Sequence, residues 1–189
     1  ELVSWAEPFT RLYEWELPYA KWYGGGKLNV TYNCLDRHVE AGLGDRVAYY
    51  YEGEPVGERA TITYRQLLDE VVRAANGLKA LGVGKGPPVG IYMGVGPGLP
   101  VAMRACARRG APHTVVFGGF SAEALADRLN DMRCEVLLTQ DESYRRGTIV
   151  PLKRNADEAL ESCPGVTKVV VGQRTRGDVP MTRGRDLTW

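Results

Sequence analysis

The sequence predicts an α/β protein in which a largely parallel, doubly wound sheet follows an aromatic and helical accessory segment. Four apolar runs are typical of strands buried on both faces: PVGIYM (88–93), HTVVF (113–117), CEVLLT (134–139) and TKVVVG (167–172). Stretches with helical periodicity or helix-capping signals separate these runs. The right-handed crossover rule turns such an alternation into a sheet with helices on both faces.

Residues 1–42 differ in composition from the rest of the chain, and we expect them to form an accessory segment laid against a main domain of residues 43–189. Aromatic side chains crowd the first part of this segment, where we interpret them as packing residues. Glycines 24–26 break any helix there, and NCLDRHVEAG (33–42) predicts a short second helix.

The main domain opens with two short runs rich in strand formers, VAYYYEG (47–53) and ATITY (60–64), which predict a strand pair. Thr63 and Gln66 have the spacing of a capping box, and the apolar periodicity after them predicts a helix ending at Gly82.

Three further helices are expected along the chain. PVAMRACARRG (100–110) ends at a glycine, Ser121 begins the next helix, and a weaker periodicity marks residues 152–160.

Composition excludes several classes of function. The formal net charge is +1, which leaves no electrostatic footprint for nucleic acid or an anionic membrane. No apolar stretch approaches the roughly 20 residues of a membrane helix, and the opening has no signal-peptide core. The first residue is Glu rather than Met, so we expect a trimmed start.

The cysteines and histidines limit the kinds of site that we expect in this chain. Cys34, Cys106, Cys134 and Cys163 are widely separated, which predicts reduced thiols in a cytoplasmic protein. His38 and His113 are the only histidines, so no zinc or other metal site is expected in this chain.

Three short motifs resemble known sites, but two fail on spacing and the third is too short to be specific. Residues 94–98 (GVGPG) place the third glycine one position early for a dinucleotide fingerprint, and Pro97 lacks an amide. Residues 82–86 (GVGKG) lack the ending of a phosphate-binding P-loop. The triplet Arg-Gly-Asp at 176–178 is attributed to chance.

Two segments remain as candidates for binding. In VVFGGFSAEALADRL, Gly118 and Gly119 leave backbone accessible before the helix, so the segment is either an anion or carbonyl site or a plain strand-to-helix turn. In DESYRRGTIVPLK, Arg145 and Arg146 follow a strand and offer paired donors suited to phosphate. The alternative there is a solvated loop.

Five blocks, taken in order, carry a resemblance that covers nearly the whole chain. GGGKLNVTYNCLDRHV, TYRQLLDEVVRAANGLKALGVGKG, HTVVFGGFSAEALADRL, DESYRRGTIVPLK and GRDLTW resemble successive segments of AMP-forming acetyl-CoA synthetase (acetate–CoA ligase). This family belongs to the adenylate-forming ligases. The resemblance implies that residues 1–42 are its amino-terminal accessory segment and that 43–189 are the first part of its large AMP-binding domain.

The resemblance also implies an activity and a binding site. Members join acetate to ATP with the help of magnesium, giving acetyl-adenylate and pyrophosphate, and coenzyme A then displaces AMP to form acetyl-CoA. Carried over residue by residue, the coenzyme A site comprises Arg145, Arg146, Gly147 and Thr148, with Gly118 and Gly119 beside the pantetheine channel. The family usually has a basic residue where Thr148 stands.

The catalytic segments of the family match nothing in this chain. Its phosphate loop, adenylate motif and catalytic lysine are expected beyond Trp189, so no catalytic residue is assigned and the chain alone is expected to be inactive. The expected partners are acetate, ATP, coenzyme A and the rest of the protein. A propionate–CoA ligase, or a non-catalytic relic that only packs against a partner, remains an alternative.

Departures from the family pattern motivate the relic alternative. Gly94, Gly96 and Gly98 replace a proline-containing, acidic motif, Pro88 stands where an arginine is usual, and Arg104 and Arg109 stand where the family has apolar residues. We expect these two arginines to place unpaired charge on a core face, at a cost on the order of several kcal/mol.

Overall fold

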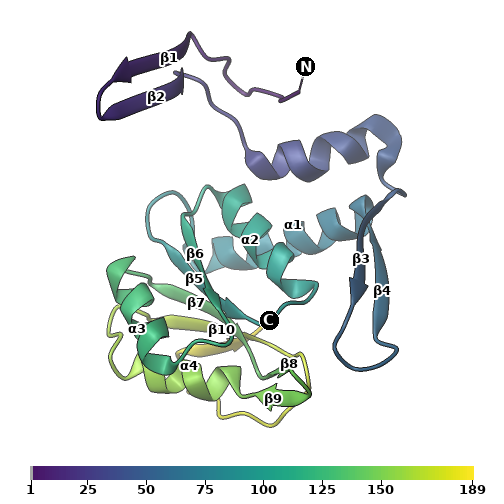
Figure 1. Cartoon of the computed structure of the whole chain (residues 1–189), viewed down its shortest axis with the longest axis vertical. Helices are drawn as coiled ribbons and strands as arrows, with labels where there is room; N and C mark the ends of the chain where they lie inside the picture. Colours follow the sequence, from purple (N-terminus) through teal and green to yellow (C-terminus); the bar gives the residue numbers. More distant parts are fainter. Residues whose placement is uncertain (1) are drawn as a thin grey trace.

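The computed structural model describes residues 2–189 and confirms the predicted α/β class (Figure 1). Five parallel strands form one sheet in the order β11-β10-β7-β5-β6. Their bounds are β5 (Val89–Met93), β6 (His113–Phe117), β7 (Val136–Gln140), β10 (Lys168–Gly172) and β11 (Asp186–Thr188). Helices cover both faces: α1 (Tyr64–Ala80) and α2 (Gly98–Arg109) on one, α3 (Ala122–Asp131) and α4 (Leu152–Leu160) on the other.

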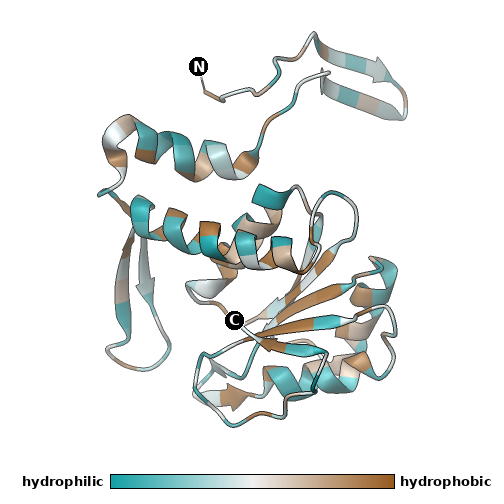
Figure 2. Ribbon diagram, turned by 180° about the vertical axis from the view of Figure 1, so that it is seen from behind, coloured by the Kyte–Doolittle hydropathy of each residue, from teal (hydrophilic) through white to brown (hydrophobic). Residues whose placement is uncertain are grey.

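Each face of the sheet has its own hydrophobic core. Successive residues of β7 point to opposite sides, so Leu137 packs under α3 and α4 while Leu138 packs under α2. Every residue of β5 and β7 is buried, which explains their uninterrupted apolar runs in the sequence. The expectation that residues 113–117 are also buried on both faces is wrong, because β6 is an edge strand of the sheet and only Val116 among its residues is buried. Figure 2 shows these apolar strands enclosed by helices whose outer surfaces are polar.

Helix α1 begins as its capping signal predicts. The Thr63 hydroxyl accepts a hydrogen bond from the Gln66 amide at 3.3 Å, and the Gln66 side chain accepts one from the Thr63 amide at 2.9 Å. The predicted strand pair before it is β3 (Val47–Glu52) and β4 (Arg59–Thr63), which are antiparallel. This hairpin extends away from the main sheet (Figure 1).

The aromatic part of the accessory segment is a β-hairpin, which the sequence pattern did not predict. Strands β1 (Arg11–Glu16) and β2 (Tyr19–Gly24) pair antiparallel, with Tyr13 opposite Trp22 and their ring centroids 5.6 Å apart. The hairpin projects from the rest of the molecule, and Tyr13, Trp15 and Trp22 are all exposed.

The second part of the accessory segment lies against the main domain, as expected. It is helical, comprising the π-helical turns η1 (Tyr32–Asp36) and η2 (Val39–Leu43). Leu35 is buried against α1 and α2, and Asp36 forms an ion pair with Arg108 at 2.7 Å. Just before η1, the side chains of Asn29 and Thr31 donate hydrogen bonds to carbonyls in the last turns of α2.

The expectation of unpaired core charges on α2 is wrong for Arg109 and too severe for Arg104. Both side chains are only partly buried. Arg109 Nε donates to the Val83 carbonyl at 3.1 Å, and the Arg104 guanidinium lies 5.6 Å from the centre of the Tyr49 ring. Within residues 2–189, Arg104 Nε is the buried side-chain polar atom that has no hydrogen-bond partner.

The structure gives one of the unusual glycines a packing role. Gly94 lies directly against Ser143, and a Cβ at position 94 would overlap the serine hydroxyl. The Gly94 amide also donates to the Gln140 side chain at 3.0 Å. A Cβ at Gly96 would meet only the Tyr51 hydroxyl at 3.9 Å, an ordinary contact. Gly94 is therefore part of an adapted local packing.

An apolar groove of about 460 Å³ lies between α1 and the β11 edge of the sheet. Leu138, Val170 and Leu187 from three neighbouring strands line its floor, and Trp189 borders it. Across residues 2–189, no helix has the length and apolar character needed to cross a membrane. In the same range, no three His, Cys, Asp or Glu side chains gather in a way that would hold a metal ion.

Candidate functional site

A cleft of about 410 Å³ opens at the carboxyl ends of β5, β6 and β7. The chain runs from β5 to β6 on one side and then returns past β5 to β7, so the strand order reverses at this point. Open α/β sheets bind their ligands in the crevice beyond the strand ends at such a reversal. Unlike the apolar groove beside α1, this cleft is also lined by two arginines, Arg145 from the segment after β7 and Arg174 from the segment after β10.

The predicted run from Arg145 to Thr148 forms the turn of a small hairpin. Its strands are β8 (Ser143–Arg145) and β9 (Thr148–Val150), and Arg145 pairs with Thr148. Arg146 and Gly147 have φ of 53° and 74°, as the two central residues of a type I′ turn require. The Thr148 hydroxyl donates to the Arg145 carbonyl at 2.8 Å, so it stabilises the turn.

Arg145 points into the cleft. Its guanidinium lies over the Phe117 ring, 4.8 Å from the centroid, which is a cation–π geometry. A Cβ at Gly119 would lie only 2.5 Å from Arg145 Nη1, so the glycine leaves the room through which this side chain passes. Phe117, Gly118, Gly119 and Arg145 all line the cleft.

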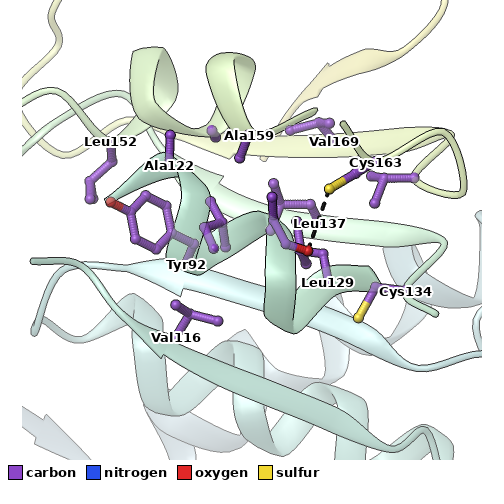
Figure 3. Close-up of a cluster of buried hydrophobic side chains, with 14 of the residues drawn as sticks. Tyr92, Val116, Ala122, Leu129, Cys134, Leu137, Leu152, Ala159, Cys163 and Val169 are labelled. Atoms are coloured by element: carbon purple, nitrogen blue, oxygen red, sulfur yellow. Dashed lines mark hydrogen bonds between the residues drawn. The ribbon is translucent and has the colours of Figure 1, made fainter. Parts of the chain in front are cut away.

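A buried tyrosine fixes the glycine turn that precedes α3. The Tyr92 hydroxyl donates to the Phe120 carbonyl at 2.9 Å and lies 3.3 Å from the Gly118 carbonyl. Burial raises the pKa of Tyr92, which keeps the hydroxyl protonated as a donor. Figure 3 shows Tyr92 within the core under α3 and α4, so the turn is attached to the hydrophobic core of the domain.

Of the two interpretations of the Gly118–Ser121 segment, the structure favours a strand-to-helix turn. The Ser121 hydroxyl accepts a hydrogen bond from the Ala124 amide at 3.3 Å and so caps α3. That amide is therefore already occupied by a side chain of this protein.

Sequence reasoning missed a second arginine in the cleft, Arg174. It donates to the Glu58 carboxylate at 2.5 Å and to the Tyr51 hydroxyl at 3.1 Å, and its guanidinium lies 5.1 Å from the centre of the Tyr144 ring. Burial alone would lower the pKa of Arg174, but its hydrogen bond to Glu58 and the other contacts raise it. Arg174 comes just after the apolar run TKVVVG, and this position was the signal that it would reach the same edge of the sheet.

A buried carboxylate holds the loop that carries Arg174. Asp141, which follows β7, accepts hydrogen bonds from the backbone amides of Arg174 at 2.7 Å and Gly177 at 3.1 Å. It also accepts from the amides of Glu142 and Thr175. One side chain thereby satisfies four amides and links the loops that follow β7 and β10.

The predicted site residues divide into two groups. Gly118, Gly119 and Arg145 line the cleft. Arg146, Gly147 and Thr148 are exposed on the neighbouring hairpin turn and do not line it. The arrangement can hold an elongated ligand along the cleft and an anion at its arginine-bearing end.

Comparisons with known proteins agree with the fold and with the sequence resemblance. Residues 35–182 match the family model described as AMP-binding enzyme, and residues 1–34 match the one described as acetyl-coenzyme A synthetase N-terminus. The chain is 52% identical to the acetyl-coenzyme A synthetase of Methanothrix thermoacetophila over 98% of its length, and 53% identical to that of Mycolicibacterium smegmatis over 99%.

A solved structure gives the same result for the fold. Acetoacetyl-CoA synthetase from Streptomyces lividans superimposes with a TM-score of 0.88 at 27% sequence identity, covering 99% of this chain and 28% of that one. The chain spans 28% of the length of the Methanothrix relative and 20% of the Mycolicibacterium one. The resemblance drawn from the sequence is confirmed, and the chain belongs to the AMP-binding enzyme family.

Proposed function

We propose that this chain is the amino-terminal part of an AMP-forming acetate–CoA ligase and that its cleft forms one wall of the coenzyme A site. Residues 1–42 are the accessory segment and 43–189 the first part of the large domain. The observation that carries the proposal is the position of Arg145. This guanidinium stacks on Phe117, crosses Gly119 and enters a cleft at the strand ends.

The chemistry of the cleft suits coenzyme A. A nucleotide with several phosphates needs cationic donors, and its narrow pantetheine arm needs backbone that can be approached closely. Arg145 supplies a donor inside the cleft, and Arg146 supplies a second on the exposed turn beside it. Gly147 and Thr148 complete this turn, and Gly118 and Gly119 border the path of the arm. In the complete enzyme, ATP, magnesium and acetate bind to segments that this chain does not contain.

The relatives support acetate as the acid that is activated, since the Methanothrix and Mycolicibacterium proteins are both acetyl-coenzyme A synthetases. In the complete enzyme, pyrophosphate release should saturate at a lower concentration of acetate than of propionate. Saturation at lower propionate would instead support the propionate ligase. We place the enzyme in the cytoplasm because the four cysteines of this chain are free thiols. We expect no nucleic-acid or membrane partner, because the charge of this part is nearly balanced.

The test of the site is Arg145→Ala in the complete enzyme. Loss of a charged hydrogen-bond donor should raise the Michaelis constant for coenzyme A about 10-fold or more and leave those for ATP and acetate within about twofold. Arg154→Ala is the matched control, because Arg154 is an exposed arginine on α4 outside the cleft. A change in the ATP dependence alone would contradict the assignment.

A further inference from the structure

The turn that carries the proposed phosphate donors already binds a carboxylate from this chain. The Gly147 amide donates a hydrogen bond to Oε1 of Glu54, 93 residues earlier in the sequence. Gly147 is the second central residue of the type I′ turn, and its amide points away from the β8–β9 ladder. An exposed amide that binds an oxyanion here is a donor of the kind that phosphate oxygens accept from.

Glu54 reaches this amide from a separate hairpin that also lines the cleft. It lies in the loop between β3 and β4, which is closed by the Gly53 amide donating to the Glu58 carbonyl at 2.7 Å. The same hairpin is held to the loop after β10 by the Glu58–Arg174 ion pair at 2.5 Å. The β3–β4 hairpin thus contacts loops after both β7 and β10, and its residues Tyr50 to Glu54 form part of the cleft lining.

We infer that Glu54 is an internal competitor for the phosphate of the ligand, and that an anion binds at the Gly147 amide only after displacing it. This inference rests on the proposed function. A phosphate and the Glu54 carboxylate are both negative, so they do not share the Gly147 amide. The apparent affinity for the ligand is then reduced by the fraction of molecules in which Glu54 is bound.

The test is Glu54→Gln in the complete enzyme, with ligand binding measured by calorimetry. Glutamine keeps the shape of the side chain but removes its charge, so the dissociation constant for coenzyme A should fall about 3- to 10-fold. The dissociation constant for pantetheine, which carries no phosphate, should stay unchanged. Glu54→Ala, which removes the acceptor altogether, should lower the constant for coenzyme A at least as far.

Glu52→Gln is the matched control. Glu52 is on the same hairpin, lines the same cleft and pairs with Arg59 at 2.8 Å, so this variant removes an equal charge from the cleft without touching Gly147. If Glu52→Gln tightens coenzyme A binding as much as Glu54→Gln does, the negative charge of the cleft as a whole accounts for the effect and the inference is overturned.

The outcomes separate the inference from the proposed function. If Arg145→Ala weakens coenzyme A binding while Glu54→Gln leaves it within about twofold, only the inference fails. If Glu54→Gln tightens ATP binding and not that of coenzyme A, Glu54 is a competitor but the coenzyme A assignment fails. If the wild-type enzyme binds no coenzyme A, both fail.

Discussion

The buried lysine on α4 offers a sharp test of what holds the last strand in place. Lys153 and Asp186 are both 0% exposed at their side chains, and their charged atoms are 3.0 Å apart. Lys153 Nζ also binds Asp157 at 2.7 Å and donates to the Pro180 carbonyl at 2.8 Å. The ion pair therefore links α4 to the start of β11.

Replacing Lys153 by methionine keeps most of the side chain's volume and leaves Asp186 buried without this partner. Removing one member of a buried pair costs about 3–5 kcal/mol. Asp186 keeps its hydrogen bond from Arg185 Nε at 2.6 Å, which compensates part of this loss. We therefore expect a decrease of about 2–4 kcal/mol in the free energy of unfolding.

The assay is urea unfolding of the complete protein, combined with amide exchange over residues 182–189, where the loss should concentrate. Lys168→Met is the matched control, because Lys168 is only partly buried and its hydrogen bond to the Gly184 carbonyl is exposed to solvent. It should cost no more than about 0.5 kcal/mol. An equally small effect for Lys153→Met would refute the reasoning that the buried pair anchors β11.

Two further predictions concern a pH dependence and a glycine. Burial alone would raise the pKa of Asp186, but hydrogen bonds from Arg185, the Thr182 amide and Lys153 lower it overall. The contribution of Asp186 to stability is therefore full above the ordinary carboxyl pKa of about 3.9 and is lost as the pH falls through the lower pKa of the folded state. Urea midpoints measured from pH 7 to 2 should show this loss. In the Asp186→Asn variant, this part of the pH dependence should be absent. Gly94→Ala should destabilise the folded protein by about 1–3 kcal/mol, because the new methyl group overlaps the Ser143 hydroxyl. A second change, Ser143→Gly, should restore the thermal midpoint of the double variant. If the midpoint is not restored, this packing account is contradicted.

Elements set by neighbouring residues could be predicted from the sequence. The Thr63–Gln66 capping box, the helix 152–160 and the strand 113–117 depend on local patterns, and all three occur in the structure. The β1–β2 hairpin could not be predicted in this way, because no regular apolar–polar alternation marks its strands. Trp22 and Tyr23 are adjacent in β2, and both strands receive almost no burial from the main domain.

In the cleft, too, some features follow from local sequence patterns and others do not. Arg145 was found from its position after an apolar strand, and the same reasoning applied to TKVVVG would have found Arg174. The contacts of Glu54 with Gly147 and of Glu58 with Arg174 join residues 93 and 116 positions apart. Neither partner has a local pattern that specifies the other, so these contacts follow only from the assembled topology.

The hydrogen bonds from the accessory segment to α2 also constrain the order of events during synthesis. Asn29 and Thr31 leave the ribosome well before their acceptors, which lie 73 to 79 residues later at the end of α2. Contacts of such separation form only after the intervening chain has been made and folded. The helix around Leu35, whose buried face rests on α1 and α2, must therefore wait for both. Residues 29–43 are therefore translated before α1 and α2 but dock only after both have formed.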